Sequence, residues 1–280
     1  MPPSGRLYKK RRSLEMDVEE YLKIKQANAK NSRAKDFLDA RYGTNKGSWT
    51  KWVFDQLFFP PHAAVLELGC GPAALWTANL HRLPGDAAVM LTDFCQGTLN
   101  AAKRALGAKA GLFGFAVVNA EQIPYADDLF DIVLANRMLY FIADRKRALF
   151  EMSRVLKPCG MLYAATMGRK NMAEISDLYF DCFQVQDRTR KTSAEFFGLE
   201  NGADQLSAYF HTVQTRRFEN ALLVTESWPL IEYVLSARSF DNRHLTPGGI
   251  RTFKNYLDGI IRRQGHIRVT KEVGLFIAEK

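Results

Sequence analysis

Ala63-Ala64-Val65-Leu66-Glu67-Leu68-Gly69-Cys70-Gly71 is an apolar run that ends in an acid and two glycines one residue apart. A run of this length predicts a buried strand, and glycines after it let the backbone approach a ligand closely. The next segment, Pro72-Ala73-Ala74-Leu75-Trp76, predicts the start of a helix. The free N–H groups of a helix start favour a polar or negatively charged ligand. The stretch therefore predicts a strand, turn and helix arranged around a ligand.

Strand and helix patterns alternate from this stretch onward. The predicted strands are apolar throughout, as expected of strands that are covered on both faces; they are Ala63–Leu68, Ala87–Thr92, Leu112–Val118, Phe130–Ala135 and Met161–Thr166. The helices predicted between them are Ala73–Leu83, Thr98–Leu106 and Arg145–Leu156. Repeated strand–helix units of this length predict an α/β fold with a parallel, doubly wound sheet.

The flanking segments are predominantly helical by pattern. Before the sheet, we predict a helix starting at the capping-box spacing Asp17–Glu20, a helix over Ala34–Ala40, and a helix capped by Ser48 that runs from Trp49 to Leu57. After it, we predict a strand within His211–Val224, helices over Thr225–Arg238 and Thr246–Gly265, and a closing strand over Ile267–Ala278.

The composition favours a folded protein that works in a reducing compartment. The chain has 280 residues, of which 47% are hydrophobic, so it can bury a core. Its four cysteines lie far apart without C-x-x-C spacing, which argues against a metal site or a disulfide framework. No apolar run is long enough to cross a bilayer, and no secretory signal follows the basic start. We therefore expect a cytoplasmic protein with no membrane contact and no metal.

The positive charge is concentrated near the N-terminus. The formal net charge is +9, and residues 1–55 hold thirteen Lys/Arg against seven Asp/Glu, which gives +6. Such an arm could attract nucleic acid or another acidic partner. A solvated helical arm explains the same charge, and the chain has no aromatic–basic RNA motif. Nucleic acid is therefore an open but unfavoured partner, and the sequence does not predict the oligomeric state.

Polar residues follow the predicted strands where a parallel sheet binds its ligands. The strand ends carry Glu67 to Gly71, then Asp93, then Asn119 and finally Asn136. Ligands of open α/β sheets bind at these carboxyl ends, and an acid after the second strand can accept hydrogen bonds from a ribose diol. The spacing Gly69, Gly71 and Ala74, followed by Asp93, also fits a nicotinamide-dinucleotide site. A dehydrogenase therefore remains an alternative.

Five segments together resemble the class I S-adenosylmethionine-dependent methyltransferases, specifically the type 11/25-like group. They stand in the order and spacing of that family's motifs; they are Val65–Pro72, Leu91–Phe94, Val118–Tyr125, Asp128–Asn136 and Glu151–Gly160. The resemblance implies a Rossmann-like, doubly wound, seven-stranded and mostly parallel sheet with a helical cap and insertions. It implies a single domain: a cap over 1–60, a cofactor-binding core over 61–170, a sixth strand with helical lid insertions over 171–265, and a last strand over 266–280.

The resemblance also implies S-adenosylmethionine as cofactor, S-adenosylhomocysteine as product, and a role for each strand-end residue. At the methionine part, the main chain from Gly69 through Cys70 to Gly71 would pass underneath, and Glu67 would hold the amino group. The backbone near Asn136 would face the same amino acid portion. At the nucleoside, Asp93 would bind the ribose, and the adenine would be contacted by Phe94, Asn119 and Ala120. The plainer alternatives are Phe94 as a core residue, Glu67 as a helix cap and Asn136 as an ordinary loop residue. Ala73, Asn119 and Cys159 depart from the family pattern.

The acceptor is less well defined than the cofactor. The catalytic residues are unknown, and Tyr140 and Trp49 are weak candidates for contacting the substrate. Trp52 and His211 are further candidates for which packing and structural roles are the alternatives. We expect an enzyme that transfers a methyl group to a small molecule by in-line displacement. The alternatives are an RNA or protein methyltransferase that uses the basic arm, and a non-catalytic relative that only binds the cofactor.

Overall fold

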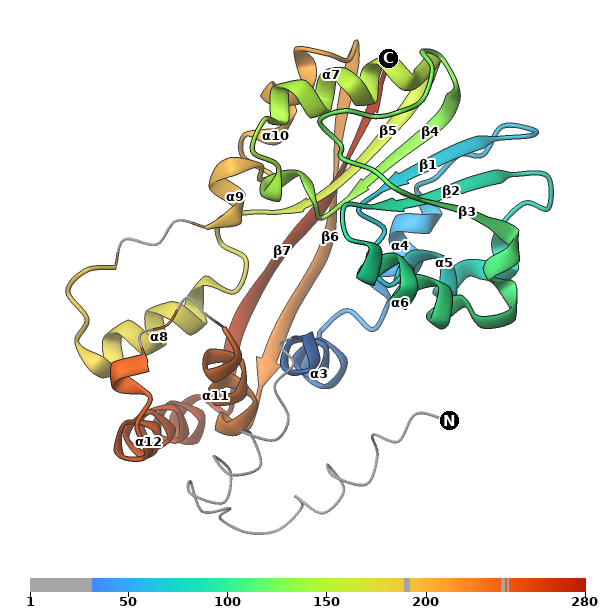
Figure 1. Cartoon of the computed structure of the whole chain (residues 1–280). Helices are drawn as coiled ribbons and strands as arrows, with labels where there is room; N and C mark the ends of the chain where they lie inside the picture. Colours follow the sequence, from blue (N-terminus) through green and yellow to red (C-terminus); the bar gives the residue numbers. More distant parts are fainter. Residues whose placement is uncertain (1–31, 189–191, 238–239, 241) are drawn as a thin grey trace. The chain divides into compact units, whose positions relative to one another are not determined.

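The computed structural model describes residues 32–188, 192–237, 240 and 242–280 (Figure 1). The helix predicted to start at Asp17–Glu20, and most of the basic arm, lie outside the described residues. The backbone contacts divide the described chain into two compact units. One unit comprises residues 45–171, 192–220 and 271–280, and the other comprises residues 32–44, 172–188 and 221–270. These borders differ from the predicted ones at 60, 170 and 265, so the single-domain arrangement stays a prediction.

The predicted sheet is confirmed: seven strands lie side by side in the order β3-β2-β1-β4-β5-β7-β6. The strands are β1 (Ala64–Leu68), β2 (Ala88–Asp93), β3 (Phe113–Val117), β4 (Phe130–Asn136), β5 (Leu156–Met167), β6 (Thr212–Val224) and β7 (Ile267–Glu279). The first five pair in parallel, and β7 pairs antiparallel with β5. Because the chain reverses its direction of winding at β1, the β1 and β4 ends mark the switch point at which such sheets bind ligands.

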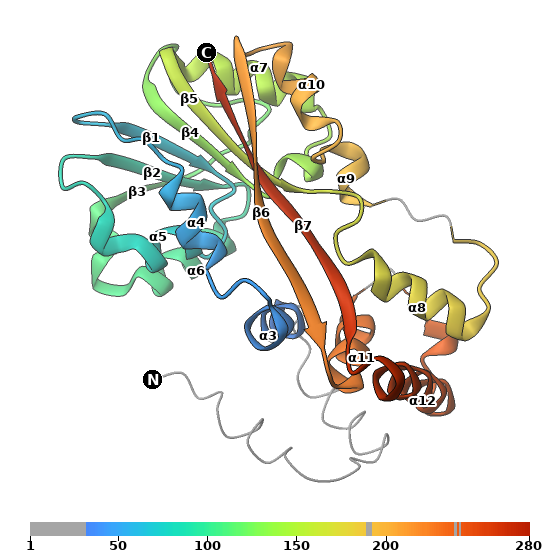
Figure 2. The same cartoon turned by 180° about the vertical axis from the view of Figure 1, so that it is seen from behind.

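The alternation of side chains along β1 divides the core of the larger unit into two layers. Leu66 and Leu68 pack in one cluster with the apolar face of α7 (Arg145–Val155). Val65, on the other side of the strand, packs on the opposite face with α4 (Trp49–Asp55), α5 (Ala74–Asn79) and α6 (Gln96–Leu106), and Figure 2 shows these helices near β1 to β3. Burial on both faces explains why these strands are apolar throughout.

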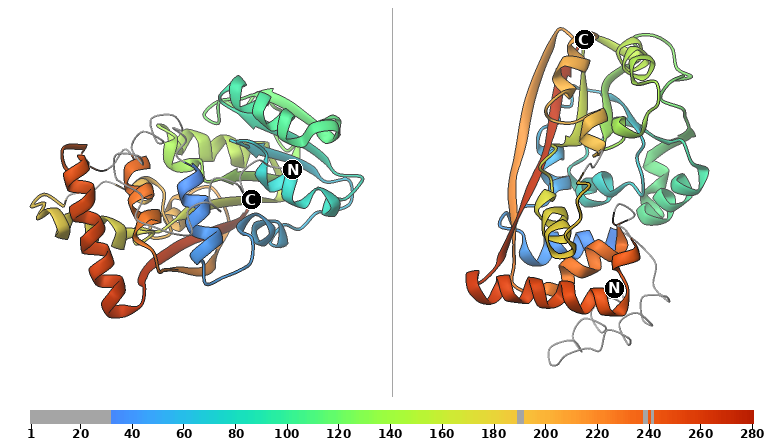
Figure 3. Two further views of the ribbon diagram at one scale, coloured as in Figure 1. Left: turned by 90° about the horizontal axis from the view of Figure 1, so that it is seen from below. Right: turned by 90° about the vertical axis from the view of Figure 1, so that its left-hand side faces the viewer.

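The second unit has its own apolar core, built mainly from four helices. They are α3 (Ser32–Tyr42), α8 (Ala173–Phe183), α11 (Ser227–Ser236) and α12 (Pro247–Gln264). Of these, α12 is the long helix drawn in orange-red in Figure 3. The predicted ends of α12 are confirmed. Thr246 Oγ1 accepts a hydrogen bond from Gly249 N at 3.2 Å, Pro247 opens the helix, and Gly265 ends it with φ +80°. Left-handed backbone at a helix end is most easily adopted by glycine.

Several predicted boundaries needed correction. The helix predicted over Ala73–Leu83 is α5 followed by the 3₁₀ turn η1 (Leu80–Arg82). Ser48 stands at the N-cap of α4, but its side chain bonds to Thr50 Oγ1 at 2.8 Å rather than capping the helix. The remaining elements are η2 (Gly107–Leu112), η3 (Leu139–Phe141), α9 (Ser193–Phe196), α10 (Gly202–Ser207) and η4 (Asn242–His244). Among the described helices, none combines the length and apolar character needed to cross a bilayer.

Candidate functional site

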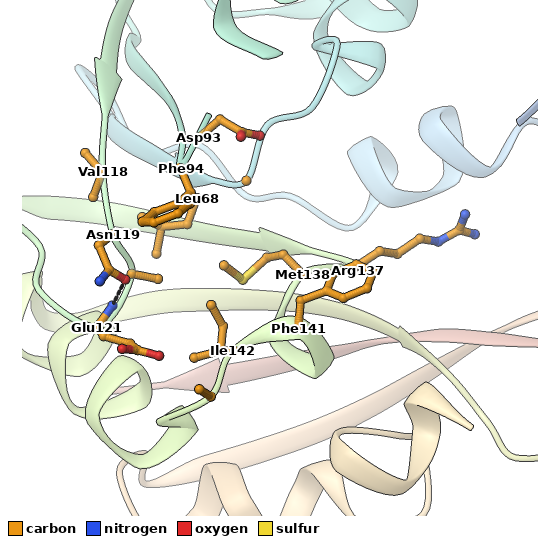
Figure 4. A pocket seen from close by; sticks show the side chains of 13 residues that line it. Leu68, Asp93, Phe94, Val118, Asn119, Glu121, Arg137, Met138, Phe141 and Ile142 are labelled. Atoms are coloured by element: carbon orange, nitrogen blue, oxygen red, sulfur yellow. Dashed lines mark hydrogen bonds between the residues drawn. The ribbon is translucent and has the colours of Figure 1, made fainter. Parts of the chain in front are cut away.

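A cavity of about 460 Å³ lies within the larger unit, where β1, β2 and β4 end (Figure 4). Its size suits a small organic ligand. The residues that line it come from strand ends and the loops that follow them; they are Leu68, Gly69, Asp93, Phe94, Val118, Asn119, Ala120, Glu121, Arg137, Met138, Phe141, Ile142 and Ala143. Five of the predicted cofactor residues, Gly69, Asp93, Phe94, Asn119 and Ala120, are therefore brought together around one cavity.

The turn after β1 has a backbone that favours glycine at two positions. Gly69 has φ +67° and Gly71 has φ +55°. A Cβ at Gly69 would lie 3.1 Å from Met138 Cβ, whereas a Cβ at Gly71 would meet no atom within 4 Å. Gly69 is thus required both by its backbone conformation and by the close approach of Met138, while Gly71 is required by conformation alone.

Asp93 connects the glycine turn with the end of β2. Its Oδ2 accepts a hydrogen bond from Gly71 N at 3.2 Å, and its Oδ1 accepts one from Cys95 N at 3.0 Å. Each carboxylate oxygen can accept a further hydrogen bond. The side chain is therefore held in place at the cavity with spare acceptor capacity, which is what binding a ribose diol requires.

The next strand contributes an amide beside the acid. Val118 N donates to Asp93 O at 3.1 Å, which joins the end of β3 to the end of β2. Asn119 Oδ1 accepts from Glu121 N at 3.0 Å, drawn as the dashed line in Figure 4. That oxygen keeps one lone pair, and the exposed side chain also presents two N–H donors. Asn119 can therefore both accept from and donate to the edge of a base.

Two aromatic residues on the cavity wall are largely exposed. Phe94 is 76% exposed and Phe141 is 78% exposed. The alternative interpretation of Phe94 as a core residue is therefore wrong. Exposed aromatic faces that line a cavity are suited to stack against a flat ligand such as a nucleobase.

Glu67 lies beneath the glycine turn and is not among the residues that line the cavity. It is 2% exposed, and its Oε2 accepts a hydrogen bond from Trp76 Nε1 at 2.5 Å. Burial raises the pKa of Glu67 to about 7, although the Trp76 hydrogen bond opposes this rise. No side chain caps α5, so the helix-cap alternative for Glu67 is wrong. Its contact with a methionine amino group stays a prediction.

Cys70 is also buried in this turn. Burial, together with the neighbouring carboxylates of Glu67 and Asp93, raises the pKa of the Cys70 thiol to about 12. A thiol with so high a pKa stays protonated at neutral pH and is a poor nucleophile. Cys70 therefore serves to fill space under the turn, and its main chain is the part that can contribute to the site.

The loop after β4 supplies cavity residues that the sequence analysis missed. The predicted cofactor residues ended at Asn136, whose Oδ1 is buried and has no hydrogen-bond partner among the described residues. Met138 and Phe141 line the cavity, whereas Tyr140 does not. Phe141 N donates to Met138 O at 2.9 Å, and residues three apart in such a 3₁₀ turn lie on the same side. This spacing was the sequence signal available for finding them.

The weaker candidates lie outside the cavity lining. Tyr140 packs against the core and its ring lies 4.6 Å from that of Phe141; burial raises the pKa of its hydroxyl. Trp49 stacks on Trp52 with ring centroids 5.3 Å apart, as the packing alternative predicted. His211 is exposed, and its N–H donates to Glu279 O at 2.8 Å. Substrate roles for Tyr140 and Trp49 stay predictions.

These features together fit S-adenosylmethionine. Gly69, Asp93, Phe94 and Asn119 all line the cavity, and the contacts that the resemblance implies for each with the methionine, ribose and adenine parts stay predictions. Among the described residues there is no group of three or more potential metal ligands.

The comparisons with known proteins find a methyltransferase domain in this part of the chain. A family model described as "Methyltransferase domain" matches residues 66–164. Relatives include the ubiquinone/menaquinone biosynthesis C-methyltransferase UbiE of Vibrio campbellii, 32% identical over 134 residues, which are 47% of this chain and 51% of that protein. UbiE of Geotalea daltonii is 26% identical over 148 residues, covering 51% of this chain and 63% of the relative. The chain therefore matches about half the length of the first of these relatives.

Solved structures support the fold. The MccD protein covers 83% of this chain and 97% of its own at 18% identity, with a TM-score of 0.53. The [4+2]-cyclase SpnF covers 95% of this chain and 97% of its own at 16% identity, also with a TM-score of 0.53. At such identities the likeness concerns the fold alone. The domain match at residues 66–164 contains the strand ends that line the cavity, so this part of the chain is similar to a methyltransferase domain.

Proposed function

We propose that the protein transfers a methyl group from S-adenosylmethionine to a small-molecule acceptor. The observation that carries the proposal is the convergence of Gly69, Asp93, Asn119 and Ala120 on one cavity. These residues come from the ends of three strands, and the domain match spans all of them. The convergence supports a nucleoside-binding crevice at the switch point of the sheet.

Each residue has a defined task in this proposal. Gly69 lets the main chain approach the methionine part, and Asp93, held by Gly71 N and Cys95 N, accepts from the ribose hydroxyls. Asn119 and the Ala120 N–H contact the adenine edge, with Phe94 against its face. When bound, S-adenosylmethionine supplies a methyl group that its sulfonium has already activated. The protein is therefore required mainly to orient the acceptor and to exclude water.

The acceptor is proposed to be small and largely apolar. The wall after β4 presents Met138, Phe141, Ile142 and Ala143. These side chains can enclose an apolar or aromatic molecule, and the same cavity also holds the charged side chains of Asp93, Glu121 and Arg137. A general base is needed only when the attacking atom must lose a proton.

Isothermal titration with S-adenosylmethionine tests the cofactor site. We expect binding to the wild-type chain and to the His211→Ala control, because His211 lies outside the cavity. Asp93→Ala should weaken binding by about 10-fold or more, as loss of a charged hydrogen-bond acceptor does. A folded wild-type chain that does not bind the cofactor would contradict the proposal.

Transfer of label from methyl-tritiated cofactor tests the acceptor class. Separate small-molecule, RNA and protein fractions of a cell extract would be incubated with the enzyme. We expect label in the small-molecule fraction; label in RNA or protein that falls steeply with salt would support the alternative in which the basic arm binds a polymer. Binding without any transfer would support a non-catalytic relative.

The four free cysteines support our proposal that the enzyme works in the reducing cytoplasm.

A further inference from the structure

We propose that the ion pair between Glu151 and Arg154 on α7 positions the β3–β4 connection, residues 118–129, so that it can distinguish one nucleobase from another. The proposal rests on the proposed function, because it assigns the pair to the nucleoside end of the same cavity. Neither side chain is among those that line the cavity, so both act as positioning residues through the connection. They belong to the segment Glu151–Gly160 that carried part of the family resemblance but received no role in binding.

The β3–β4 connection has little regular structure of its own. Residues 118–129, all of which the structure describes, form neither a helix nor a strand. At one end, Val118 N donates to Asp93 O at 3.1 Å. At the other end, Leu129 N donates to Val155 O at 2.9 Å. Irregular backbone between two such attachments needs bonding partners from other elements, and these partners then determine its shape.

Glu151 supplies a buried acceptor for the middle of this connection. It is 3% exposed, and its Oε2 accepts a hydrogen bond from Ile123 N at 2.9 Å. Arg154 donates to the same carboxylate through Nε at 3.1 Å and through Nη2 at 2.8 Å. The hydrogen bonds from Arg154 hold the pKa of Glu151 below its ordinary value, although burial opposes the decrease. The carboxylate is therefore charged at neutral pH and bonds to the connection and to Arg154 together.

Arg154 donates to the connection while Glu151 accepts from it. Its Nη1 donates to Tyr125 O at 2.9 Å and to Asp127 Oδ1 at 2.6 Å, and its Nη2 donates to Ile123 O at 2.9 Å. Together with the two bonds to Glu151, these bonds occupy all five N–H donors of the guanidinium. Because the guanidinium is planar and rigid, the bonds fix the connection in one geometry relative to α7.

The residues held in this way are neighbours of those that face the cavity. Asn119, Ala120 and Glu121 line the cavity, and Ile123 follows two positions later. Ala120 and Ile123 are buried in the same apolar cluster as Met152 of α7. Hydrogen bonds to a base edge require donor–acceptor distances of about 2.7–3.2 Å, so a small displacement weakens them. A shift of the connection on α7 would therefore impair the reading of the base.

Two ligands that differ at the base edge test this assignment. S-Adenosylhomocysteine carries adenine, whereas S-inosylhomocysteine carries hypoxanthine, which has a carbonyl oxygen in place of the amino group. Isothermal titration would measure both ligands against wild type, Arg154→Lys and Glu151→Gln. Wild type should favour S-adenosylhomocysteine by about 10-fold or more, because the wrong base leaves hydrogen-bonding groups unpaired. Each variant should lower this preference to about 2-fold or less, mainly by weakening S-adenosylhomocysteine.

The two variants are chosen to keep the chain folded. Arg154→Lys retains the positive charge beside Glu151, but an ammonium group has three donors and no planar shape, so it cannot make the five bonds. Glu151→Gln retains an oxygen that can accept from Ile123 N, and Arg154 keeps Asp127 as a charged partner at 2.6 Å. Neither substitution leaves a buried charge without a partner, which is the change that most destabilises such a pair.

The controls separate base reading from a loss of stability. A less stable chain would lower both affinities or neither, because the same folded protein binds the two ligands. Lys157→Gln breaks a comparable pair, Lys157 with Asp131 at 2.8 Å, outside the connection, and should change neither affinity. Asn119→Ala should lower the preference by itself, and adding Arg154→Lys should lower it little further.

The outcomes separate this inference from the proposed function. An unchanged preference in both Arg154→Lys and Glu151→Gln, or equal losses for the two ligands, would overturn the inference alone. A wild-type chain that binds both ligands equally well would also overturn it, since the connection would then not read the base, while cofactor binding itself would stand. Failure of the wild-type chain to bind either ligand would refute the proposed function and the inference with it.

Discussion

Replacing Glu67 by glutamine tests the buried carboxyl beneath the glycine turn. Burial raises the pKa of Glu67 from its ordinary value of 4.5 to about 7. Below pH 4.5 the carboxyl is protonated in both the folded and the unfolded chain. As the pH rises from 4.5 to about 7, the unfolded chain loses this proton first, so the free energy of unfolding falls. Above about pH 7 the loss is complete.

The size of this loss follows from the same two values. At about 1.36 kcal/mol per pH unit, the interval from 4.5 to about 7 corresponds to about 3 kcal/mol. The amide introduced by Glu67→Gln has no proton to lose, and its oxygen can still accept from Trp76 Nε1. The variant should therefore gain about 3 kcal/mol relative to wild type between pH 4.5 and pH 8.

Urea unfolding at half-unit pH steps from about pH 4.5 to 8.5 would measure the difference in the free energy of unfolding between wild type and Glu67→Gln. Other titrating groups are common to both, so their contributions largely cancel in that difference. A difference that does not change with pH would refute the argument that burial controls the protonation of Glu67. If Glu67 also holds the methionine amino group, Glu67→Gln should weaken S-adenosylhomocysteine while stabilising the empty protein.

Other substitutions probe separate parts of the structure. Gly69→Ala and Gly71→Ala should each lose about 1–2 kcal/mol of stability in thermal melts, because both positions have left-handed backbone. Only Gly69→Ala should also displace Met138, and titration should show that it weakens S-adenosylhomocysteine binding about 10-fold. Cys159→Gly should raise stability by about 0.5–1 kcal/mol, because Cys159 is exposed and has φ +62°; an unchanged or lower thermal midpoint would contradict this. Asp93→Asn should weaken S-adenosylhomocysteine by about 10-fold or more in titration, since one carboxylate oxygen becomes a donor facing Gly71 N; unchanged affinity would remove Asp93 from the ribose site.

The sheet and its strand-end residues could be predicted because their signals are local. Strands covered on both faces are continuous apolar runs, and the ends of parallel strands meet at one edge whatever the loops do. Asp93 and Asn119 were therefore placed correctly from sequence. Cys159 stands where glycine is common in the family that the chain resembles. Its φ of +62° is a left-handed backbone, which explains the preference for glycine at this position.

Tertiary contacts explain what the sequence did not reveal. Glu67 bonds to the indole of Trp76 nine residues later, a contact that depends on how α5 packs under β1. Arg137 stacks on Trp49, which precedes it by almost ninety residues. The loop after β4 has no periodic pattern to indicate which side chains face the cavity, apart from the three-residue spacing of η3.

A crystal structure of the chain with S-adenosylhomocysteine tests the central claim most directly. We predict the ribose hydroxyls on Asp93, the adenine beside Phe94 and Asn119, and the methionine part along Gly69. A ligand bound elsewhere on the chain, or in this cavity with its nucleoside away from Asp93, would contradict it.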